Sequence, residues 1–156
     1  GIRPGLPARP YLPKLVAAAK AAAQRGGKDP NAVDCIVSIP TFVSDDIGQA
    51  RSAARYNLAF FAQLPFYRKQ WRRCGFVEEM NAIQKLWQEI GDRKAAAALI
   101  PDRMVEEVCI FGSVSQCRDQ LEAFREAGAA MPVLAVSPVN EERLAATRKA
   151  LHLLRP

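Results

Sequence analysis

The feature that most constrains the fold of this chain is a strand–helix–strand pattern in its last third. A short apolar run, Val108–Phe111, is followed by a glycine and by Ser113, which begins a helix that ends near Ala127. Gly128 stops this helix, and a second apolar run covers Pro132–Val136. Two short apolar runs joined by an amphipathic helix are typical of a parallel α/β unit, so the pattern predicts a helix-rich α/β fold.

The earlier part of the chain adds one more strand and a long helical stretch. Val33–Ile39 is β-branched and mostly apolar, which predicts a buried strand. Pro40 is expected to end it, because proline has no N–H to give to the ladder. Roughly sixty residues of helical periodicity follow before Val108, far more than one crossover needs. We expect a single domain over residues 1–156, divided into an extended arm that is not packed (1–11), helix–strand–helix (12–58), a helical insertion (59–104) and strand–helix–strand–helix (105–156).

Composition limits the classes of function. No apolar run reaches the roughly 18–20 residues of a membrane span, and the first ten residues lack the apolar segment of a signal peptide. We therefore expect a cytoplasmic location and no membrane partner. None of the four cysteines forms a CxxC pair and His152 is remote from them, so no metal site is expected. Cys35 and Cys109 lie in apolar runs and Cys117 lies on the apolar stripe of a helix, which favours reduced core residues.

Four segments occur in a recognisable order. They are Val37–Ala50, which contains Ser44-Asp45-Asp46; Leu64–Arg68 with Gly75-Phe76; Ile100–Val105 leading to Phe111–Val114; and Glu126–Gly128 followed by Pro132–Leu134. In this order and spacing they resemble the C-terminal half of the luciferase-like monooxygenases and reductases that depend on flavin or deazaflavin. The resemblance implies the C-terminal portion of a (β/α)8 barrel, with a large helical insertion and two barrel strands, Val33–Ile39 and Val133–Ser137, the last two of eight.

The same resemblance implies oxidoreductase chemistry on a small-molecule substrate. Members of this family use a reduced flavin for monooxygenation or hydride transfer, or a deazaflavin for hydride transfer, so FMN or a deazaflavin is the expected cofactor. No residue of this chain matches the N-terminal catalytic positions of the family, and no catalytic residue is assigned. We expect the chain to be inactive alone, and binding of a cofactor by this chain alone is left open. A second copy of the chain, or the N-terminal half of a barrel, is the expected partner.

Functional side chains of barrels gather at the carboxyl ends of the strands. Here those ends hold Thr41 and Ser137, whose hydroxyls would bind a cofactor or else satisfy turn and cap groups. Ser113 begins a helix and fits a capping box with Gln116. The free amides at that helix start would receive a phosphate, or Ser113 is a plain N-cap.

Aromatic and basic residues of the insertion leave further alternatives. Phe66, Tyr67 and Trp71 would form the wall of a substrate pocket, or else pack in the core. A nucleic-acid-binding module is a further alternative, with Tyr67 and Trp71 stacking on bases beside the basic cluster Arg68, Lys69, Arg72 and Arg73. A solvated helix face explains the same cluster. A non-catalytic α/β module that self-associates through an open sheet edge is the remaining alternative.

Overall fold

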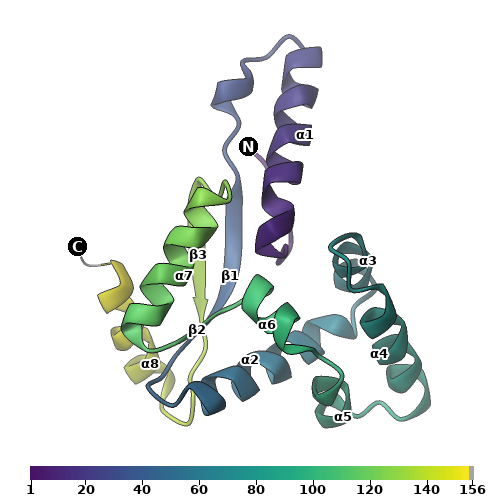
Figure 1. Cartoon of the computed structure of the whole chain (residues 1–156), viewed down its shortest axis with the longest axis vertical. Helices are drawn as coiled ribbons and strands as arrows, with labels where there is room; N and C mark the ends of the chain where they lie inside the picture. Colours follow the sequence, from purple (N-terminus) through teal and green to yellow (C-terminus); the bar gives the residue numbers. More distant parts are fainter. Residues whose placement is uncertain (155–156) are drawn as a thin grey trace.

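The computed structural model describes residues 1–154, and a parallel sheet of three strands lies at the centre of this part of the chain (Figure 1). The strand order is β2-β1-β3, with β1 at Ile36–Val43, β2 at Ile110–Gly112 and β3 at Met131–Val136. The predicted helix-rich α/β class is confirmed. The long pairing is between β1 and β3, which correspond to the two strands expected from a partial barrel.

The order of the strands in the sheet differs from their order in the chain. The runs near Val108 and Pro132 form β2 and β3 of one parallel sheet, and β1 lies between them. β2 pairs only with the last residues of β1, where Thr41 lies opposite Ile110 and Val43 opposite Gly112. β2 is thus a short addition at the carboxyl end of β1.

β1 also continues through Pro40, so the prediction that this proline ends the strand was wrong. The amide of Ser44 donates to the carbonyl of Gly112 at 2.8 Å, on the β2 side of β1. Backbone amides alternate between the two edges along a strand, so the position of Pro40 also faces the β2 side. Because β2 begins only opposite Thr41, the missing N–H of Pro40 removes no ladder hydrogen bond.

Helices surround the sheet unevenly (Figure 1). α1 and α7 lie along it, α2 runs across its carboxyl end, and α3, α4 and α5 form a group to one side. Their bounds are α1 (Leu12–Arg25), α2 (Ile47–Ala62), α3 (Pro65–Arg73), α4 (Val77–Glu89), α5 (Arg93–Ala98), α6 (Asp102–Val108), α7 (Val114–Glu126) and α8 (Arg143–Leu151), with 3-10 turns at Arg9–Tyr11, Pro30–Ala32 and His152–Leu154.

The two faces of β1 bury different sets of side chains. On one face, Cys35, Val37 and Ile39 pack into a core with α1, α7 and α8. On the other face, Phe42 joins a second core that fills the space between α2, α3, α4 and α6. The largest fully buried side chains of this second core include Trp71, Phe76, Leu58, Met80, Ile83 and Met104. The helical insertion is therefore packed onto the carboxyl end of β1.

The first eleven residues end in the 3-10 turn at Arg9–Tyr11 and are packed against the rest of the protein, which corrects the expectation of an unpacked arm. Ile2 forms a parallel bridge with Cys35 beside β1, and Leu6 is buried. The indole Nε1 of Trp71 donates to the carbonyl of Leu6 at 2.8 Å. A Cβ at Gly5 would lie 2.6 Å from the ring of Phe66, so only glycine allows the arm to approach α3 this closely. The arm thereby brings Leu6 to the carboxyl end of the sheet.

We predict that Trp71→Phe lowers the free energy of unfolding by about 1–3 kcal/mol, because the buried carbonyl of Leu6 loses its donor. Trp87→Phe is the matched control, since the buried Nε1 of Trp87 has no hydrogen-bond partner among the described residues. We expect the control to be nearly neutral. Urea unfolding of the two variants measures the difference, and equal losses would contradict the importance of this bond.

Candidate functional site

The carboxyl ends of β1 and β3 border a cavity of about 450 Å³. Its apolar lining comes from the arm, the strands and α2, and consists of Leu6, Pro40, Phe61, Leu134, Ala135 and Val136. Its polar lining comes from α2, the end of β3 and α8, and consists of Asn57, Ser137, Arg143 and Thr147. An apolar cavity with a few convergent polar groups is the usual form of a small-molecule site.

Asn57 is the most unusual group in this lining. Its Oδ1 atom is buried and accepts no hydrogen bond from any residue that the structure describes. Buried carbonyls almost always have a partner, because removal from water without one is costly. Asn57 and Phe61 are separated by one helical turn of α2, so both side chains lie on one face of that helix. The cavity is therefore lined by a side chain with an unused acceptor, beside an aromatic ring.

Two more polar side chains that line the cavity have no hydrogen-bond or ion-pair partner among the described residues. Within residues 1–154, the guanidinium of Arg143 makes no ion pair or hydrogen bond, and the hydroxyl of Ser137 makes no hydrogen bond. The hydroxyl of Thr147, in contrast, donates to the carbonyl of Arg143 at 2.8 Å. An acceptor, a hydroxyl and a cation are thus available to a ligand at one place.

The structure separates the three residues predicted to bind a cofactor. Thr41 and Ser137 are neighbours, since the amide of Ser137 donates to the carbonyl of Thr41 at 2.9 Å. Only Ser137 lines the cavity, because the Thr41 side chain is fully buried and its hydroxyl donates to the carbonyl of Ile39 at 2.9 Å. Thr41 therefore fills a structural role in this arrangement.

Ser113 lies at the start of α7, beside β2, and it does not line the cavity. Its hydroxyl accepts from the amide of Gln116 at 3.3 Å, and the Gln116 side chain accepts from the amide of Ser113 at 2.9 Å. The capping box expected from the sequence is therefore complete. Both groups already have partners, which favours the role of a plain N-cap.

The three aromatic residues predicted to form a pocket wall lie in different surroundings. Trp71 is fully buried, Tyr67 is half-buried and Phe66 is exposed. None of them lines the cavity, but Tyr67 packs against Phe61, which does, with their ring centres 4.9 Å apart. Tyr67 thus supports the cavity wall through its contact with Phe61. The sequence analysis assigned no role to Asn57, although its spacing of one helical turn from Phe61 puts both residues on the same side of α2.

Arg143 was also missed, and no local pattern marks it. It is the first residue of α8, a helix whose amphipathic stripe is weak, and it meets α2 only through the folding of the sheet. The expected barrel architecture could have indicated this residue, since loops that follow the last strands of such barrels often bind phosphate.

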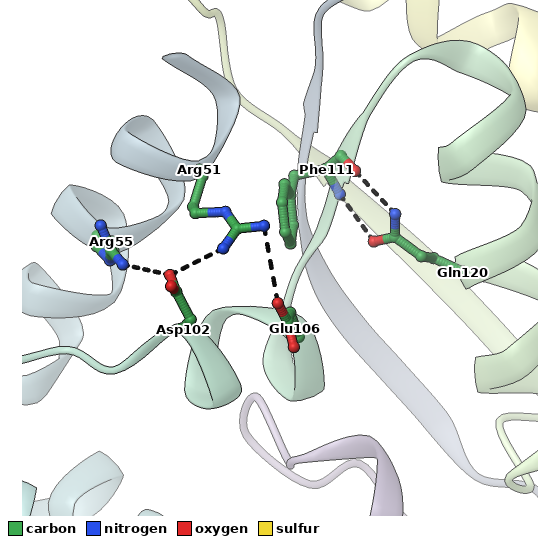
Figure 2. A network of polar contacts seen from close by, with 6 residues as sticks. All are labelled: Arg51, Arg55, Asp102, Glu106, Phe111 and Gln120. Atoms are coloured by element: carbon green, nitrogen blue, oxygen red, sulfur yellow. Dashed lines mark hydrogen bonds and ion pairs between the residues drawn. The ribbon is translucent and has the colours of Figure 1, made fainter. Parts of the chain in front are cut away.

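An ion-pair network holds α2, which carries Asn57, against α6 (Figure 2). The Asp102 carboxylate lies 3.1 Å from the Arg51 guanidinium and also pairs with Arg55. Glu106 lies 3.7 Å from Arg51 on the same side. These side chains are partly exposed, so each pair contributes little alone, and their joint effect is to fix the position of α2.

The same network reaches β2. The Arg51 guanidinium lies 5.5 Å from the centre of the Phe111 ring, and the Gln120 side chain is hydrogen-bonded to both backbone groups of Phe111, at 3.1 and 2.8 Å (Figure 2). Gln120 thus takes the place of a further strand at the edge of β2. These residues are all engaged with one another, so the network positions the site and is not itself a site.

Two of the four residues in the basic cluster of α3, Arg68 and Arg72, form hydrogen bonds within the protein. Arg68 is buried and donates to the carbonyls of Ala62 and Gln63, at 2.8 and 2.5 Å, at the end of α2. Burial, and secondarily the charge of Arg72, lowers the pKa of Arg68. Arg72 donates to two side chains of α4. This arrangement weakens the nucleic-acid alternative, because two of the four cations are occupied.

The cysteines are free, as the sequence indicates. Burial raises the pKa of Cys117 to about 12 and that of Cys109 further still, so both thiols are neutral at physiological pH. Among residues 1–154, no group of three or more His, Cys, Asp and Glu side chains is placed to hold a metal ion. None of the helices described combines the length and apolar character needed to cross a membrane.

Comparison with known proteins identifies the family. Residues 5–131 match the model of the luciferase-like monooxygenases, and the chain belongs to this family. The fold is also that of the coenzyme F420-dependent tetrahydromethanopterin reductase of Methanopyrus kandleri, with a TM-score of 0.74 at 20% identity. That match covers 99% of this chain and 43% of the reductase. The chain thus has the fold of part of a larger barrel enzyme.

Other relatives agree with this placement. A putative coenzyme F420-dependent oxidoreductase of Mycobacterium tuberculosis is 25% identical over 107 residues, which are 65% of this chain and 30% of that protein. An F420-dependent secondary alcohol dehydrogenase, solved with an F420–acetone adduct, has a TM-score of 0.59 at 16% identity, over 97% of this chain and 39% of that one. The chain therefore spans about a third of the length of the curated relative that it matches.

We predict that Ser113→Ala lowers the free energy of unfolding by about 1 kcal/mol, because the first turn of α7 loses its cap. Ser115→Ala, in the exposed part of the same turn, is the control and should change stability by less than about 0.5 kcal/mol. Thermal unfolding of both variants measures the effect. If Ser113→Ala instead left stability unchanged and abolished binding of a phosphorylated cofactor, the plain N-cap role would be wrong.

Proposed function

We propose that this chain forms the C-terminal part of the barrel of a luciferase-like oxidoreductase that transfers hydride with a deazaflavin. The family match supports an oxidoreductase, and a relative named as F420-dependent, together with two F420-dependent structural neighbours, favours a deazaflavin over FMN. The observation that carries the proposal is the cavity at the carboxyl ends of β1 and β3, where Asn57, Ser137 and Arg143 have unused polar groups. The proposal retains the cytoplasmic location expected from the sequence.

The lining of this cavity fits such a cofactor chemically. A deazaflavin has a flat apolar ring system with a polar edge and an anionic tail. Phe61 and Leu6 offer apolar surface to the ring, Asn57 and Ser137 offer polar contacts to its edge, and Arg143 offers a cation to the tail. When bound in its reduced form, a deazaflavin supplies a hydride to a small-molecule substrate. Leu6 and Phe61 would exclude water from that side of the ring.

The first experiment is a fluorescence titration of the 156-residue chain with coenzyme F420 and with FMN. We expect saturable binding of F420 at micromolar concentration and weaker binding of FMN. Binding of neither cofactor at several hundred micromolar would overturn the proposal for this chain. Tighter binding of FMN than of F420 would assign the site to a flavin instead.

We predict that Arg143→Gln weakens binding of 5-deazaflavin mononucleotide about three- to tenfold and leaves binding of 5-deazariboflavin, which lacks the phosphate, unchanged. The reason is the loss of one partly screened ion pair in an open site. Arg148→Gln, on the same helix but outside the cavity lining, is the control. An equal loss for both ligands would show that Arg143 supports the fold and does not contact the phosphate.

A second candidate function, a self-associating module, is favoured by the exposure of β3. Met131 is 55% exposed and Val133 is 39% exposed, on the face that β3 shares with Ser38 and Pro40 of β1. The outer edge of β3 pairs with no other strand among the described residues. Exposed apolar strands with a free edge drive association, so we propose that a second copy covers this face when no other part of a barrel is present.

We predict that Val133→Lys converts the isolated chain from a dimer to a monomer, because a charge cannot be buried in the contact. Leu144→Lys, at an exposed apolar position on α8, is the control and should leave the dimer intact. Sedimentation equilibrium measures the mass. A wild-type chain that is monomeric at 100 µM would overturn this second candidate.

A further inference from the structure

We propose that Asn57 binds the polar edge of the cofactor ring. Its side-chain carbonyl accepts a hydrogen bond from the lactam N–H that lies between the two ring carbonyls of a deazaflavin. This inference rests on the proposed function and adds a residue-specific contact to it. It makes Asn57 the group that decides which edge of the ring enters the cavity at the end of β3.

The first argument is the state of the Asn57 side chain. Its Oδ1 is buried, yet neither this atom nor the side-chain amide nitrogen has a hydrogen-bond partner within residues 1–154. A side chain that served only the fold would be expected to satisfy its polar atoms, as the Thr41 hydroxyl and the Gln120 carboxamide do. Asn57 lines the cavity and no hydrogen bond among the described residues holds its side chain, so the carboxamide is free to turn its carbonyl to the donor of a ligand bound there.

The second argument is that Asn57 is held firmly in place. It lies in the middle of α2, between Arg55, which pairs with Asp102 of α6, and Leu58, which is fully buried. One turn further along, Phe61 lines the same cavity and packs against Tyr67. A carboxamide carried by a fixed helix next to an aromatic ring can select one orientation of a flat ligand ring.

The third argument concerns the kind of donor. The cavity lining contains Arg143 and no carboxylate, so a cationic donor such as an ammonium group is disfavoured there. A neutral N–H donor on an otherwise anionic ligand is compatible with the positive charge of Arg143. The carboxamide of Asn57 also matches a lactam edge as a pair, because its carbonyl accepts from the ring N–H while its NH₂ group can donate to an adjacent ring carbonyl.

The test compares two ligands and three proteins. The ligands are 5-deazariboflavin and its N3-methyl derivative, which lacks the lactam donor. The proteins are the wild-type chain, Asn57→Leu, which has a similar size but no acceptor, and Asn57→Asp, which keeps an acceptor. Fluorescence titration gives Kd for each combination, so no turnover is needed. Thr147→Val is the control, since the Thr147 hydroxyl lines the same cavity but is bonded to the Arg143 carbonyl.

We expect the wild-type chain and Thr147→Val to bind the parent ligand at least tenfold more tightly than the N3-methyl ligand. Asn57→Leu should bind the two ligands equally, with the affinity that the wild type has for the methylated one, and Asn57→Asp should keep part of the preference. Because leucine and asparagine are similar in size, a preference lost in Asn57→Leu reflects the hydrogen bond and not the space for the methyl group.

Two results would overturn the inference while leaving the proposed function intact. One is wild-type binding of both ligands with equal affinity, and the other is a preference for the parent ligand that persists in Asn57→Leu. Failure of the wild-type chain to bind F420 or either test ligand would overturn the proposed function itself, and the inference with it.

Discussion

The structure depends on the parallel pairing of β1 with β3. Parallel strands cannot be joined by a tight turn, so the chain between them must cross over, and here that connection contains the whole helical insertion, β2 and α7. The pairing also aligns the carboxyl ends of the two strands, which places Ser137 beside Thr41. The cavity exists at this end because α2 leaves β1 there and runs across the end of the sheet.

The insertion is held to the sheet by apolar burial and is positioned by polar contacts. Phe42 of β1 and the buried faces of α2, α3, α4 and α6 share one core, which supplies most of the stabilisation. The pairing of Arg51 and Arg55 with Asp102 is weak in energy because the side chains are partly exposed, but it fixes the rotation of α2 (Figure 2). That rotation aims Asn57 and Phe61 at the cavity.

The polar groups of the chain fall into two sets. Thr41, Ser113 and Arg68 each form hydrogen bonds to backbone groups within the protein, so these side chains serve the fold. Asn57 Oδ1 and the Arg143 guanidinium have no such partner in residues 1–154, and both residues line one cavity. The second set distinguishes a binding site from a scaffold: the buried Asn57 carbonyl is costly to the fold unless a ligand completes it, and the exposed Arg143 cation is available to an anion.

The sequence by itself determined the local elements. The capping box at Ser113, the Asp46 cap of α2, the reduced cysteines, the apolar run of β3 and the family resemblance all rest on short-range chemistry that neighbouring residues carry. Only the tertiary structure decided that β1 lies between β2 and β3, that Pro40 fits within a strand, and that Asn57 and Arg143 meet at one cavity. Those outcomes depend on which backbone edges face each other and on contacts between segments far apart in the chain, and no local pattern encodes them.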